Sequence, residues 1–387
     1  MTIKREITAE LLHCANEYPV ITLIGPRQSG KTTLVKKIFP NHSYVNLENP
    51  EIKKIAVNDP KTLFAHFPPP VIFDEIQNVP ELLSWIQVVV DDKPDKKAQF
   101  ILTGSHQMQL RQSVTQSLAG RTALLKLLPF SMFELSDYVN ETERSTILLN
   151  GFMPRLHDQN IRRERYYQDY YLTYVERDVR KLISIENQNT FELFLRLLAG
   201  RVGNEINYSD ISNQVGISSV QIKKWISILE ASFIIFRLPP YYANFGKRLT
   251  KSPKIYFIEV GLAAYLLGIE NEQQLERDPA FGGLFENMLI AEALKQRLNA
   301  GKDPALYFFR DHHQNEVDLL YTIEGETTAV EIKSSRTYNQ EFNKGIRYFQ
   351  KISKTKNRGL VLYDGDLQIS NDTADVINFR NFFTRCK

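Results

Sequence analysis

The sequence predicts an α/β protein with more than one domain, and three patterns along the chain predict it. An apolar strand at 20–24 runs through a glycine-containing turn into a helical segment at 33–39. Two short helical segments precede a pair of apolar strands within 233–258. A strand hairpin within 316–333 follows another helical segment. With 387 residues, the chain is long enough for two to four domains.

Composition excludes several classes of protein. The 43% hydrophobic and 24% charged residues are typical of a soluble globular protein, and a net charge of +3 does not by itself predict a nucleic-acid partner. Cys14 and Cys386 are the two cysteines, so neither a disulfide framework nor a metal-ligand spacing is expected. No apolar run approaches the ~20 residues of a membrane span. We expect a cytoplasmic protein with no membrane partner.

The glycine-containing turn has the spacing of a phosphate-binding loop. Two glycines let the backbone curl so that successive N–H groups point at a phosphate. The lysine would reach the β- and γ-phosphates, and the following threonine hydroxyl would bind Mg²⁺. The sequence therefore predicts a site for ATP and Mg²⁺. Its residues are Gly25, Pro26, Arg27, Gln28, Ser29, Gly30, Lys31, Thr32 and Thr33.

A second strand, 71–75, is apolar and ends in two carboxylates, Asp74 and Glu75. In a nucleotide site Asp74 would orient Mg²⁺, and Glu75 would polarise the attacking water. A buried strand capped by acids is the alternative for such a segment alone. Behind a complete phosphate-binding loop, the catalytic interpretation is favoured.

The strand at 99–103 predicts a polar side chain near the γ-phosphate or the attacking water. Ser105 is the first candidate and Thr103 the second, while a simple turn after a core strand is the alternative. Arg121 is a candidate for an arginine that stabilises transferred phosphate, from its own or a neighbouring subunit. A surface ion pair is the alternative for Arg121.

These motifs resemble a known group of proteins. GPRQSGKT, VIFDE, ILTGS, SLAGR and LPFS look like the AAA+-type P-loop ATPases of bacteria and archaea. The resemblance implies ATP-dependent hydrolase chemistry at Lys31, Thr32, Asp74, Glu75 and Ser105, and it favours Arg121. AAA+-type cores often place their site between subunits, so a homo-oligomer is a further expectation.

Residues 141–200 have helical spacing, with tyrosines and charges interleaved around 162–179. The tyrosines either stack on bases or pack against a neighbouring domain, and packing is favoured. The stretch Tyr-Val-Glu-Arg-Asp-Val again resembles the AAA+-type group, in which it follows the core as a helical lid. In that place Arg177 could approach the nucleotide.

The segment at 205–258 predicts a winged helix-turn-helix. A second helix at 218–230 is capped by Ser218, and a basic loop joins the two strands that follow. Residues 201–254 hold eight Lys or Arg against three acids, an excess of +5. We expect DNA contact, with packing against protein as the alternative. The expected apolar side of the helix is Val220, Ile222, Trp225, Ile226 and Leu229, and the expected DNA-phosphate contacts are Lys223, Lys224, Lys247, Arg248 and Lys251.

The C-terminal hairpin carries a second group of charged residues. Its strands place Asp318 and Glu331 side by side, and Lys333 projects from the same face as Glu331. Two carboxylates and a lysine suit a metal-dependent phosphodiesterase that holds Mg²⁺ or Mn²⁺.

This pattern resembles the PD-(D/E)XK, or restriction-endonuclease-like, fold. Asp318 matches the first acid, Glu331-Ile332-Lys333 the E-x-K, and Glu286 the acid of the first helix, which makes Glu286, Asp318 and Glu331 the expected metal ligands. Val317 stands where the proline of the motif is expected, and the Gln-x3-Tyr signature is missing. These departures leave cleavage open.

Together the patterns predict four units and two hypotheses for their function. The first is an ATP-hydrolysing protein that acts on DNA and nicks or cuts it. The second is a nucleotide-dependent switch whose nuclease-like domain is inactive and serves recognition. The units are a P-loop core at 1–140, a helical lid at 141–203, a winged helix-turn-helix at 204–274 and a nuclease-like α/β domain at 278–387.

Overall fold

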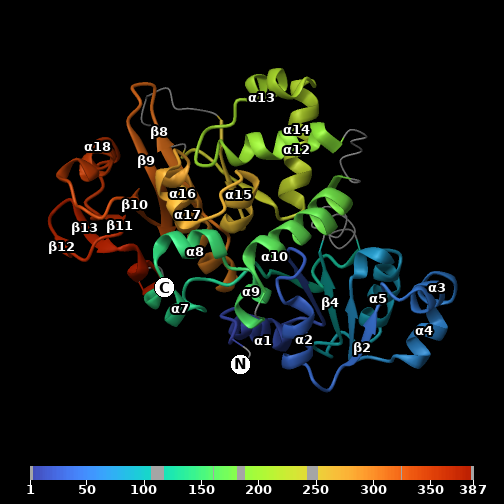
Figure 1. Ribbon diagram of the computed structural model, residues 1–387. Helices are drawn as coiled ribbons and strands as arrows, with labels where there is room; N and C mark the ends of the chain where they lie inside the picture. Colours follow the sequence, from blue (N-terminus) through green and yellow to red (C-terminus); the bar gives the residue numbers. More distant parts are fainter. Residues whose placement is uncertain are drawn as a thin grey trace.

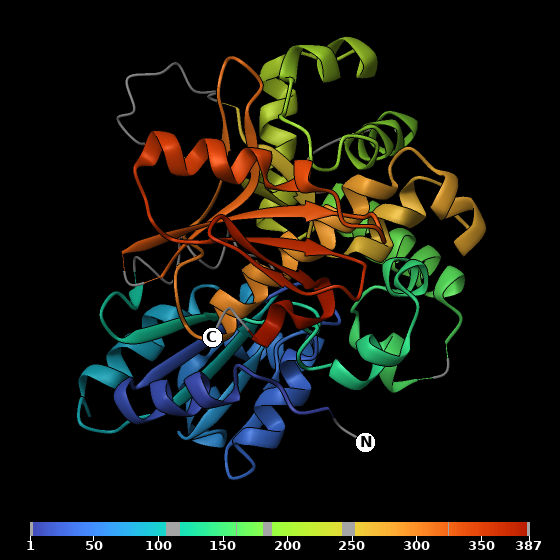
Figure 2. The same ribbon diagram turned by 90° about the vertical axis from the view of Figure 1, so that its left-hand side faces the viewer.

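The computed structural model contains an N-terminal α/β part, a helical middle and a C-terminal α/β part (Figure 1). Figure 2 shows the C-terminal sheet in front and above the N-terminal part. Within the described residues, no helix combines the length and the apolar character needed to cross a membrane. The described residues are 3–105, 117–159, 161–180, 188–241, 252–323 and 325–384.

The N-terminal part is built on a five-stranded parallel sheet of order β2-β3-β4-β1-β5. Ile24 at the end of β1 is level with Gly104 of β4 on one side and Lys126 of β5 on the other. Because all strands run the same way, their carboxyl ends meet at one edge. The strands are β1 (Val20–Ile24), β2 (Ser43–Asn46), β3 (Val71–Asp74), β4 (Phe100–Gly104) and β5 (Thr122–Lys126).

Helices cover both faces of this sheet. On one face, Leu11, Leu34 and Val35 pack against inward-facing strand residues such as Ile21 and Ile72. On the other face, apolar side chains of α5 pack on the sheet in a separate cluster. The helices are α1 (Thr8–Glu17), α2 (Lys31–Ile38), α3 (Pro50–Asn58), α4 (Pro60–His66), η1 (Ile76–Asn78) and α5 (Leu82–Asp91).

The middle of the chain is helical, as predicted. The tyrosines of 162–179 are buried, so they pack within the protein and do not form a stacking surface for bases. Tyr174, for example, donates a hydrogen bond to the Ser232 carbonyl at 2.8 Å. The elements are α7 (Ser136–Glu141), α8 (Arg144–Asn150), α9 (Pro154–Asp158), α10 (Arg163–Tyr170), the π-helix η2 (Tyr171–Val179) and α12 (Gln188–Ala199).

Two helices, a two-stranded antiparallel sheet and then two short helices follow. The Ser218 side chain caps the second helix by accepting a hydrogen bond from the Gln221 N–H, as expected. Val220 is 75% exposed, so its predicted place on the apolar side of that helix is wrong. It is the second residue of this helix and lies in its first turn. The elements are α13 (Tyr208–Val215), α14 (Ser219–Ala231), β6 (Ile235–Leu238), β7 (Lys254–Phe257), α15 (Val260–Leu266) and α16 (Glu272–Arg277).

The C-terminal part has a six-stranded mixed sheet of order β12-β13-β11-β10-β9-β8. The first three strands in the sequence, β8, β9 and β10, form an antiparallel meander. After a helix, β11 pairs with β10 in parallel. The elements are α17 (Phe281–Asn299), β8 (Leu306–Arg310), β9 (Glu316–Ile323), β10 (Glu326–Lys333), η3 (Gln340–Asn343), α18 (Lys344–Ser353), β11 (Gly359–Tyr363), β12 (Ile369–Ser370), β13 (Ala374–Asn378) and η4 (Phe379–Thr384).

A continuous apolar core joins the three parts. It runs from one face of the N-terminal sheet (Phe73, Phe100), through the middle helices, to α17 and one face of the C-terminal sheet (Leu319, Val330). The long helix α17 lies at the centre of this arrangement (Figure 1). Apolar burial on this scale makes the parts pack as one body.

Candidate functional site

The loop between β1 and α2 is shaped by left-handed backbone and a close approach. Gly30 has φ +92° and Gln28 has φ +64°, conformations that let the chain fold back over the end of β1. The Gly25 N–H donates to the Gly104 carbonyl at 3.2 Å. A Cβ on Gly25 would lie 2.0 Å from the Leu127 carbonyl oxygen. The loop therefore curls over the end of β1 and leaves no room for a side chain at Gly25.

Replacing Gly25 with alanine is expected to lower stability by about 1–3 kcal/mol, because backbone must shift to relieve the overlap. The same shift moves the N–H groups of the loop, so affinity for ATP should fall as well. Thermal unfolding and titration with a fluorescent ATP analogue measure the two effects. Gly282→Ala is the matched control, since its Cβ would meet its nearest atom at 3.9 Å. Equal losses in both variants would contradict the prediction.

Lys31 is the first residue of α2, and its side chain is buried. Its Nζ donates to the carbonyl oxygens of Gly25 at 3.0 Å and Pro26 at 2.8 Å. Burial lowers the pKa of Lys31 to about 8, although the carboxylates of Glu75 and Asp74 act in the opposite direction. A buried ammonium held by neutral carbonyls is well placed to exchange them for an anionic phosphate.

Asp74, at the end of β3, is surrounded by hydroxyl groups. Thr32 Oγ1 donates to its Oδ2 at 2.9 Å, the Tyr44 hydroxyl donates to the same oxygen at 2.7 Å, and the Thr103 hydroxyl donates to Oδ1. A carboxylate next to a threonine hydroxyl is the oxygen donor set that Mg²⁺ prefers. Thr32 and Asp74 therefore fit a Mg²⁺ ion beside the phosphate cradle.

Glu75 directly follows β3 in the left-handed conformation, with φ +57°. Its Oε2 accepts a hydrogen bond from Ser105 Oγ at 3.0 Å. Gln77 Nε2 donates to Ser105 Oγ at 3.1 Å and also to Glu75. The structure thus brings Glu75 and Ser105 together at neighbouring strand ends, whereas Thr103 is directed to Asp74. Gln77 is a member of this group that the sequence motifs did not indicate.

A cavity of about 800 Å³ opens beside these residues. It has the size of a small-molecule site. Residues from the phosphate-binding loop, the N-terminal segment and α9 line it together. They include Ile3, Lys4, Arg5, Thr8, Arg27, Gln28, Gly30, Lys31, Thr32, Thr33, Glu48, Glu75, Pro154, Arg155, Asp158 and Gln159.

Arg5 is a second residue that the motifs did not indicate. Its guanidinium donates to the Ser29 carbonyl at 2.8 Å and to the Leu128 carbonyl at 2.7 Å, and it pairs with Glu134 at 2.9 Å. It therefore joins the phosphate-binding loop to the segment after β5. Nothing in the local sequence around Arg5 predicts this, because all three partners lie elsewhere in the chain.

Arg27 connects the loop to the helical middle. It forms ion pairs with Asp178 of η2 at 3.0 Å and with Glu48 at 3.6 Å. Its guanidinium also lies 5.7 Å from the centre of the Tyr174 ring. Arg177 is turned to Asp178, with its Nε 2.8 Å from Oδ1, and is 55% exposed. Asp178 and Tyr174 of this helix therefore approach the loop, whereas the Arg177 guanidinium pairs with Asp178.

Arg121 lies at the opposite edge of the sheet. Its carbonyl accepts from the Val20 N–H at the start of β1, whereas the phosphate-binding loop begins at the end of β1. Its guanidinium pairs with Asp91 at 2.6 Å. Five strand residues span about 16 Å, so Arg121 lies far from the phosphate-binding loop of its own chain. A role across subunits stays a prediction.

In the C-terminal sheet, the structure brings Asp318, Glu331 and Lys333 together. Lys333 Nζ lies 3.0 Å from Asp318 Oδ2 and 2.5 Å from Glu331 Oε2. The Ile332 N–H also donates to Asp318 Oδ2 at 2.8 Å. Burial, and then the Asp318 charge, raises the pKa of Glu331 well above its usual range. Burial alone would lower the pKa of Lys333, but the two carboxylates raise it, so the ammonium stays charged.

Glu286, the expected acid of the first helix, has different partners. Its Oε1 accepts from Lys254 Nζ at 3.1 Å and from the Tyr256 hydroxyl at 2.5 Å. Lys254 Nζ also lies 2.5 Å from Glu316 Oε1. Over the described residues, no three or more His, Cys, Asp or Glu side chains are arranged to hold a metal ion. The expected metal site at Glu286, Asp318 and Glu331 therefore stays a prediction.

The predicted DNA-contacting lysines lie partly on the described chain. Lys223 and Lys224 are exposed on α14, and Lys223 Nζ lies 5.2 Å from the centre of the Tyr208 ring. The three basic residues expected on the wing lie outside the described residues, and so does Cys386. These three are Lys247, Arg248 and Lys251.

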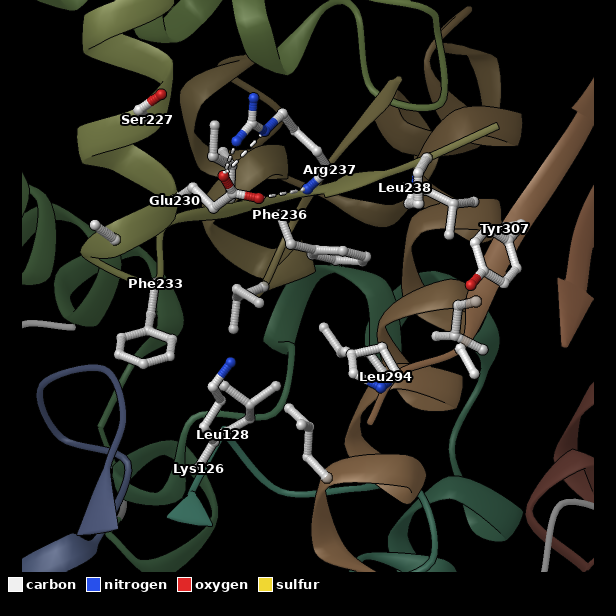
Figure 3. Close-up of a pocket in the computed structure, with 18 residues that line it drawn as sticks. Lys126, Leu128, Ser227, Glu230, Phe233, Phe236, Arg237, Leu238, Leu294 and Tyr307 are labelled. Carbon is white, nitrogen blue, oxygen red and sulfur yellow. Dashed lines mark hydrogen bonds and ion pairs between the residues drawn. The ribbon is translucent and has the colours of Figure 1, made fainter. Parts of the chain in front are cut away.

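A second cavity, of about 730 Å³, lies between the end of β5, the β6 strand and the end of α17. Figure 3 shows its largely apolar lining, with Phe233 and Leu294 on different sides and Glu230 paired with Arg237. None of the predicted site residues line it. Its lining offers few donors for phosphate, so the nucleotide site is the first cavity.

Comparison with protein families divides the chain into three matched segments. Residues 17–136 match the model of an AAA domain. Residues 141–273 and 281–382 match two separate domains of unknown function, DUF8612 and DUF4143.

Comparisons of the chain with other proteins found relatives and solved structures that are less than 30% identical to it. An uncharacterized protein of Mycobacterium tuberculosis is 29% identical over 339 residues, which cover 86% of this chain and 74% of the relative. An uncharacterized protein of Haemophilus influenzae is 22% identical over 303 residues, which cover 70% of this chain and 73% of that relative. The Walker-type ATPase of Pyrococcus abyssi is a similar solved structure, with 17% identity, a TM-score of 0.48, and coverage of 68% of this chain and 96% of that chain.

The N-terminal part combines a parallel sheet of order 2-3-4-1-5, a phosphate-binding loop after β1 and an acidic pair after β3. Its residues match the AAA domain model. Residues 17–136 are therefore similar to an AAA domain, and this part of the chain has the fold of a P-loop nucleotide-binding domain.

Proposed function

We propose that this protein is an ATP-hydrolysing switch that binds DNA through its helix-turn-helix region. In this proposal the C-terminal domain has the restriction-endonuclease-like fold but serves recognition and does not cleave. The observation that carries the proposal is the pairing of the C-terminal carboxylates with lysine ammonium groups. Lys333 pairs with Asp318 and Glu331, and Lys254 pairs with Glu286.

Each polar residue of the nucleotide site has a proposed role. Lys31 binds the β- and γ-phosphates of ATP, Thr32 and Asp74 hold Mg²⁺, and Glu75 takes a proton from the attacking water. Bound Mg²⁺ supplies positive charge that offsets the charge of the transferred phosphate. Ser105 keeps the Glu75 carboxylate oriented, which their 3.0 Å hydrogen bond supports.

The described part of the helix-turn-helix region supports DNA binding. Helix α14 presents Lys223 and Lys224 to solvent together with the exposed Val220. Lysines on the second helix of such a motif contact phosphates, while an apolar residue in its first turn can meet a thymine methyl group. Glu230 of α14 and Arg237 of β6 form an ion pair, which joins the helix to this strand.

Cleavage of DNA is the second candidate, and one observation favours it. The order α17, three antiparallel strands, α18 and a parallel β11 is the topology expected of a restriction-endonuclease-like domain. Glu331 and Lys333 lie together at the end of β10, as the E-x-K pattern requires. We place this candidate second because lysines fill the carboxylate cluster.

Two sets of contacts support coupling between the nucleotide and the other domains. Arg27 of the phosphate-binding loop pairs with Asp178 of η2. Glu292 of α17 accepts from the Met132 N–H at 2.8 Å, and Lys295 donates to the Phe130 carbonyl at 2.8 Å. A change of the loop on binding ATP would therefore act on two elements outside the ATPase domain.

The test is binding of a fluorescent DNA duplex, followed by anisotropy across a salt series with and without a non-hydrolysable ATP analogue. Lys223→Ala/Lys224→Ala should weaken binding and reduce the slope of log affinity against log salt by about two. Lys53→Ala/Lys54→Ala is the matched control, because these neighbouring lysines are exposed on α3 of the ATPase domain. The nucleotide should change the affinity in the wild type.

Three results would contradict the proposal. The first is no binding to DNA, and the second is an equal loss in the two lysine pairs. The third is nicking of plasmid DNA with Mg²⁺ or Mn²⁺ that Glu331→Ala abolishes, which would establish the nuclease candidate instead.

A further inference from the structure

Lys254 brings a positive charge into the C-terminal domain from another region of the chain. It is the first residue of β7, in the hairpin that follows α14, and it is only 2% exposed. Its Nζ lies 3.1 Å from Glu286 Oε1 and 2.5 Å from Glu316 Oε1. These carboxylates belong to α17 and β9, so Lys254 joins two separate elements of the C-terminal domain.

The position of Lys254 is fixed by its backbone as well as by its ammonium. β7 pairs with β6 in register from Leu238↔Lys254 to Ile235↔Phe257. On its other side, Lys254 forms an isolated antiparallel bridge with Glu205. Tyr256, two residues on and so on the same face, also donates to Glu286. A single strand therefore delivers two hydrogen-bond donors to Glu286.

Three positive groups pair with the carboxylates of this region. Glu316 pairs with Arg310 at 3.4 Å, in addition to Lys254. Lys333 forms ion pairs with the neighbouring Asp318 and Glu331. Arg310 also pairs with Glu205 at 3.2 Å, so five carboxylates meet three cations, and burial makes each unmatched charge costly. A divalent cation added to this arrangement would have to compete with ammonium groups that are already hydrogen-bonded.

We propose that Lys254 is an internal counter-ion that occupies the cation position between Glu286 and the β9 carboxylates, so that the acidic site takes a divalent metal ion only when this ammonium is absent. The residues present, with Lys254 in place, do not fit a resident metal. The inference extends the proposed function, because it gives the reason that the C-terminal domain does not cleave. It makes Lys254 the residue that decides which cation the site holds.

The experiment measures Mn²⁺ binding to the full chain without nucleotide, by electron paramagnetic resonance. The wild type and Glu286→Gln should bind the same amount of Mn²⁺, because no wild-type Mn²⁺ site depends on Glu286. Lys254→Met should gain one equivalent of Mn²⁺, and Lys254→Met/Glu286→Gln should lose it. Lys302→Met, which removes an exposed lysine beyond the end of α17, is the matched control and should gain none. Mn²⁺ should also raise the Tm of Lys254→Met but not that of the wild type.

Two results would overturn the proposal. One is a wild-type Mn²⁺ site that depends on Glu286 while Lys254 is present, and the other is folded Lys254→Met that binds no Mn²⁺. If Lys254→Met does not fold, the triple variant Lys254→Met/Glu286→Gln/Glu316→Gln decides. Recovered folding supports the counter-ion role, and continued failure to fold shows that Lys254 acts through packing. Loss of DNA binding alone would contradict the proposed function and leave this result unaffected.

Discussion

Replacing Glu75 with glutamine is expected to slow ATP hydrolysis by roughly 10²–10⁴-fold, the usual effect of losing a general base. Glutamine keeps the size of the side chain and its hydrogen bond from Ser105, but it cannot accept a proton from water. Affinity for ATP should change little, because Lys31 and the loop N–H groups bind the phosphates. Phosphate release at saturating ATP, together with titration of a fluorescent ATP analogue, separates the two effects.

Glu48→Gln is the matched control for this prediction. Glu48 also lines the nucleotide cavity, and its carboxylate lies 3.6 Å from Arg27. The substitution removes the same charge from the same cavity, but Glu48 is 52% exposed and is not hydrogen-bonded to Ser105. Hydrolysis should therefore be nearly unchanged. A similar loss in both variants would show that Glu75 acts through the field of the cavity and not on water.

The parts of the nucleotide site that are local in the chain could be predicted from the sequence. The phosphate-binding loop and the two acids after β3 depend on residues next to each other, and the structure places them at one edge of the sheet. Ser105 was also predictable, since a polar residue after a strand beside β3 must lie near Glu75 when all strands are parallel.

Residues that reach the site from distant segments could not be predicted in this way. Tyr44 meets Asp74 because β2 and β3 are neighbours, an order that no local pattern gives. Arg5 donates to the loop at the Ser29 carbonyl and has two further partners, Leu128 and Glu134, in the segment after β5. Lys254 was predicted within a basic segment of a DNA-binding region, yet it is buried among carboxylates. A count of charged residues identifies a basic segment, but it cannot show which of its lysines and arginines are buried.

The position of Arg121 in the sheet could not be predicted for a similar reason. A strand has two ends, and only its carboxyl end lies beside the phosphate-binding loop in a parallel sheet. Arg121 comes just before β5, so the strand direction carries it to the far edge. The sequence shows that a strand follows Arg121, but the sheet topology decides which end is functional.

The contact between the ATPase domain and α17 contains buried charged groups. Lys295 Nζ donates to the Phe130 carbonyl at 2.8 Å and lies 4.1 Å from the centre of the Phe152 ring. Glu292, one turn earlier, accepts from the Met132 N–H, and the buried Glu259 accepts from the Phe152 N–H at 3.0 Å. Burial raises the pKa of Glu292 to about 7, and the Lys295 charge opposes this rise.

Burial and the Glu292 pKa together predict how stability depends on pH. Folded Glu292 binds a proton more readily than unfolded Glu292, whose pKa is near 4.5. Its favourable contribution is therefore complete below about pH 4.5 and is lost as the pH rises through about 7. The unfolding free energy of the wild type should fall across this window.

Lys295→Met should deepen this loss and extend it to higher pH, because the cation that favours ionised Glu292 and Glu259 is gone. We expect a destabilisation of about 1–3 kcal/mol at pH ~8.5, where the Phe130 carbonyl has lost its donor and the folded state holds buried carboxylates without a nearby cation. At pH ~5 both carboxyls are protonated more easily, so the loss should be smaller. Chemical denaturation at the two pH values measures both.

Lys295→Met/Glu292→Gln should recover part of the loss at high pH, since one of the two charges is removed. An equal loss at both pH values would mean that Lys295 stabilises the contact through its hydrogen bond to Phe130 and its packing on Phe152, and that its charge contributes nothing.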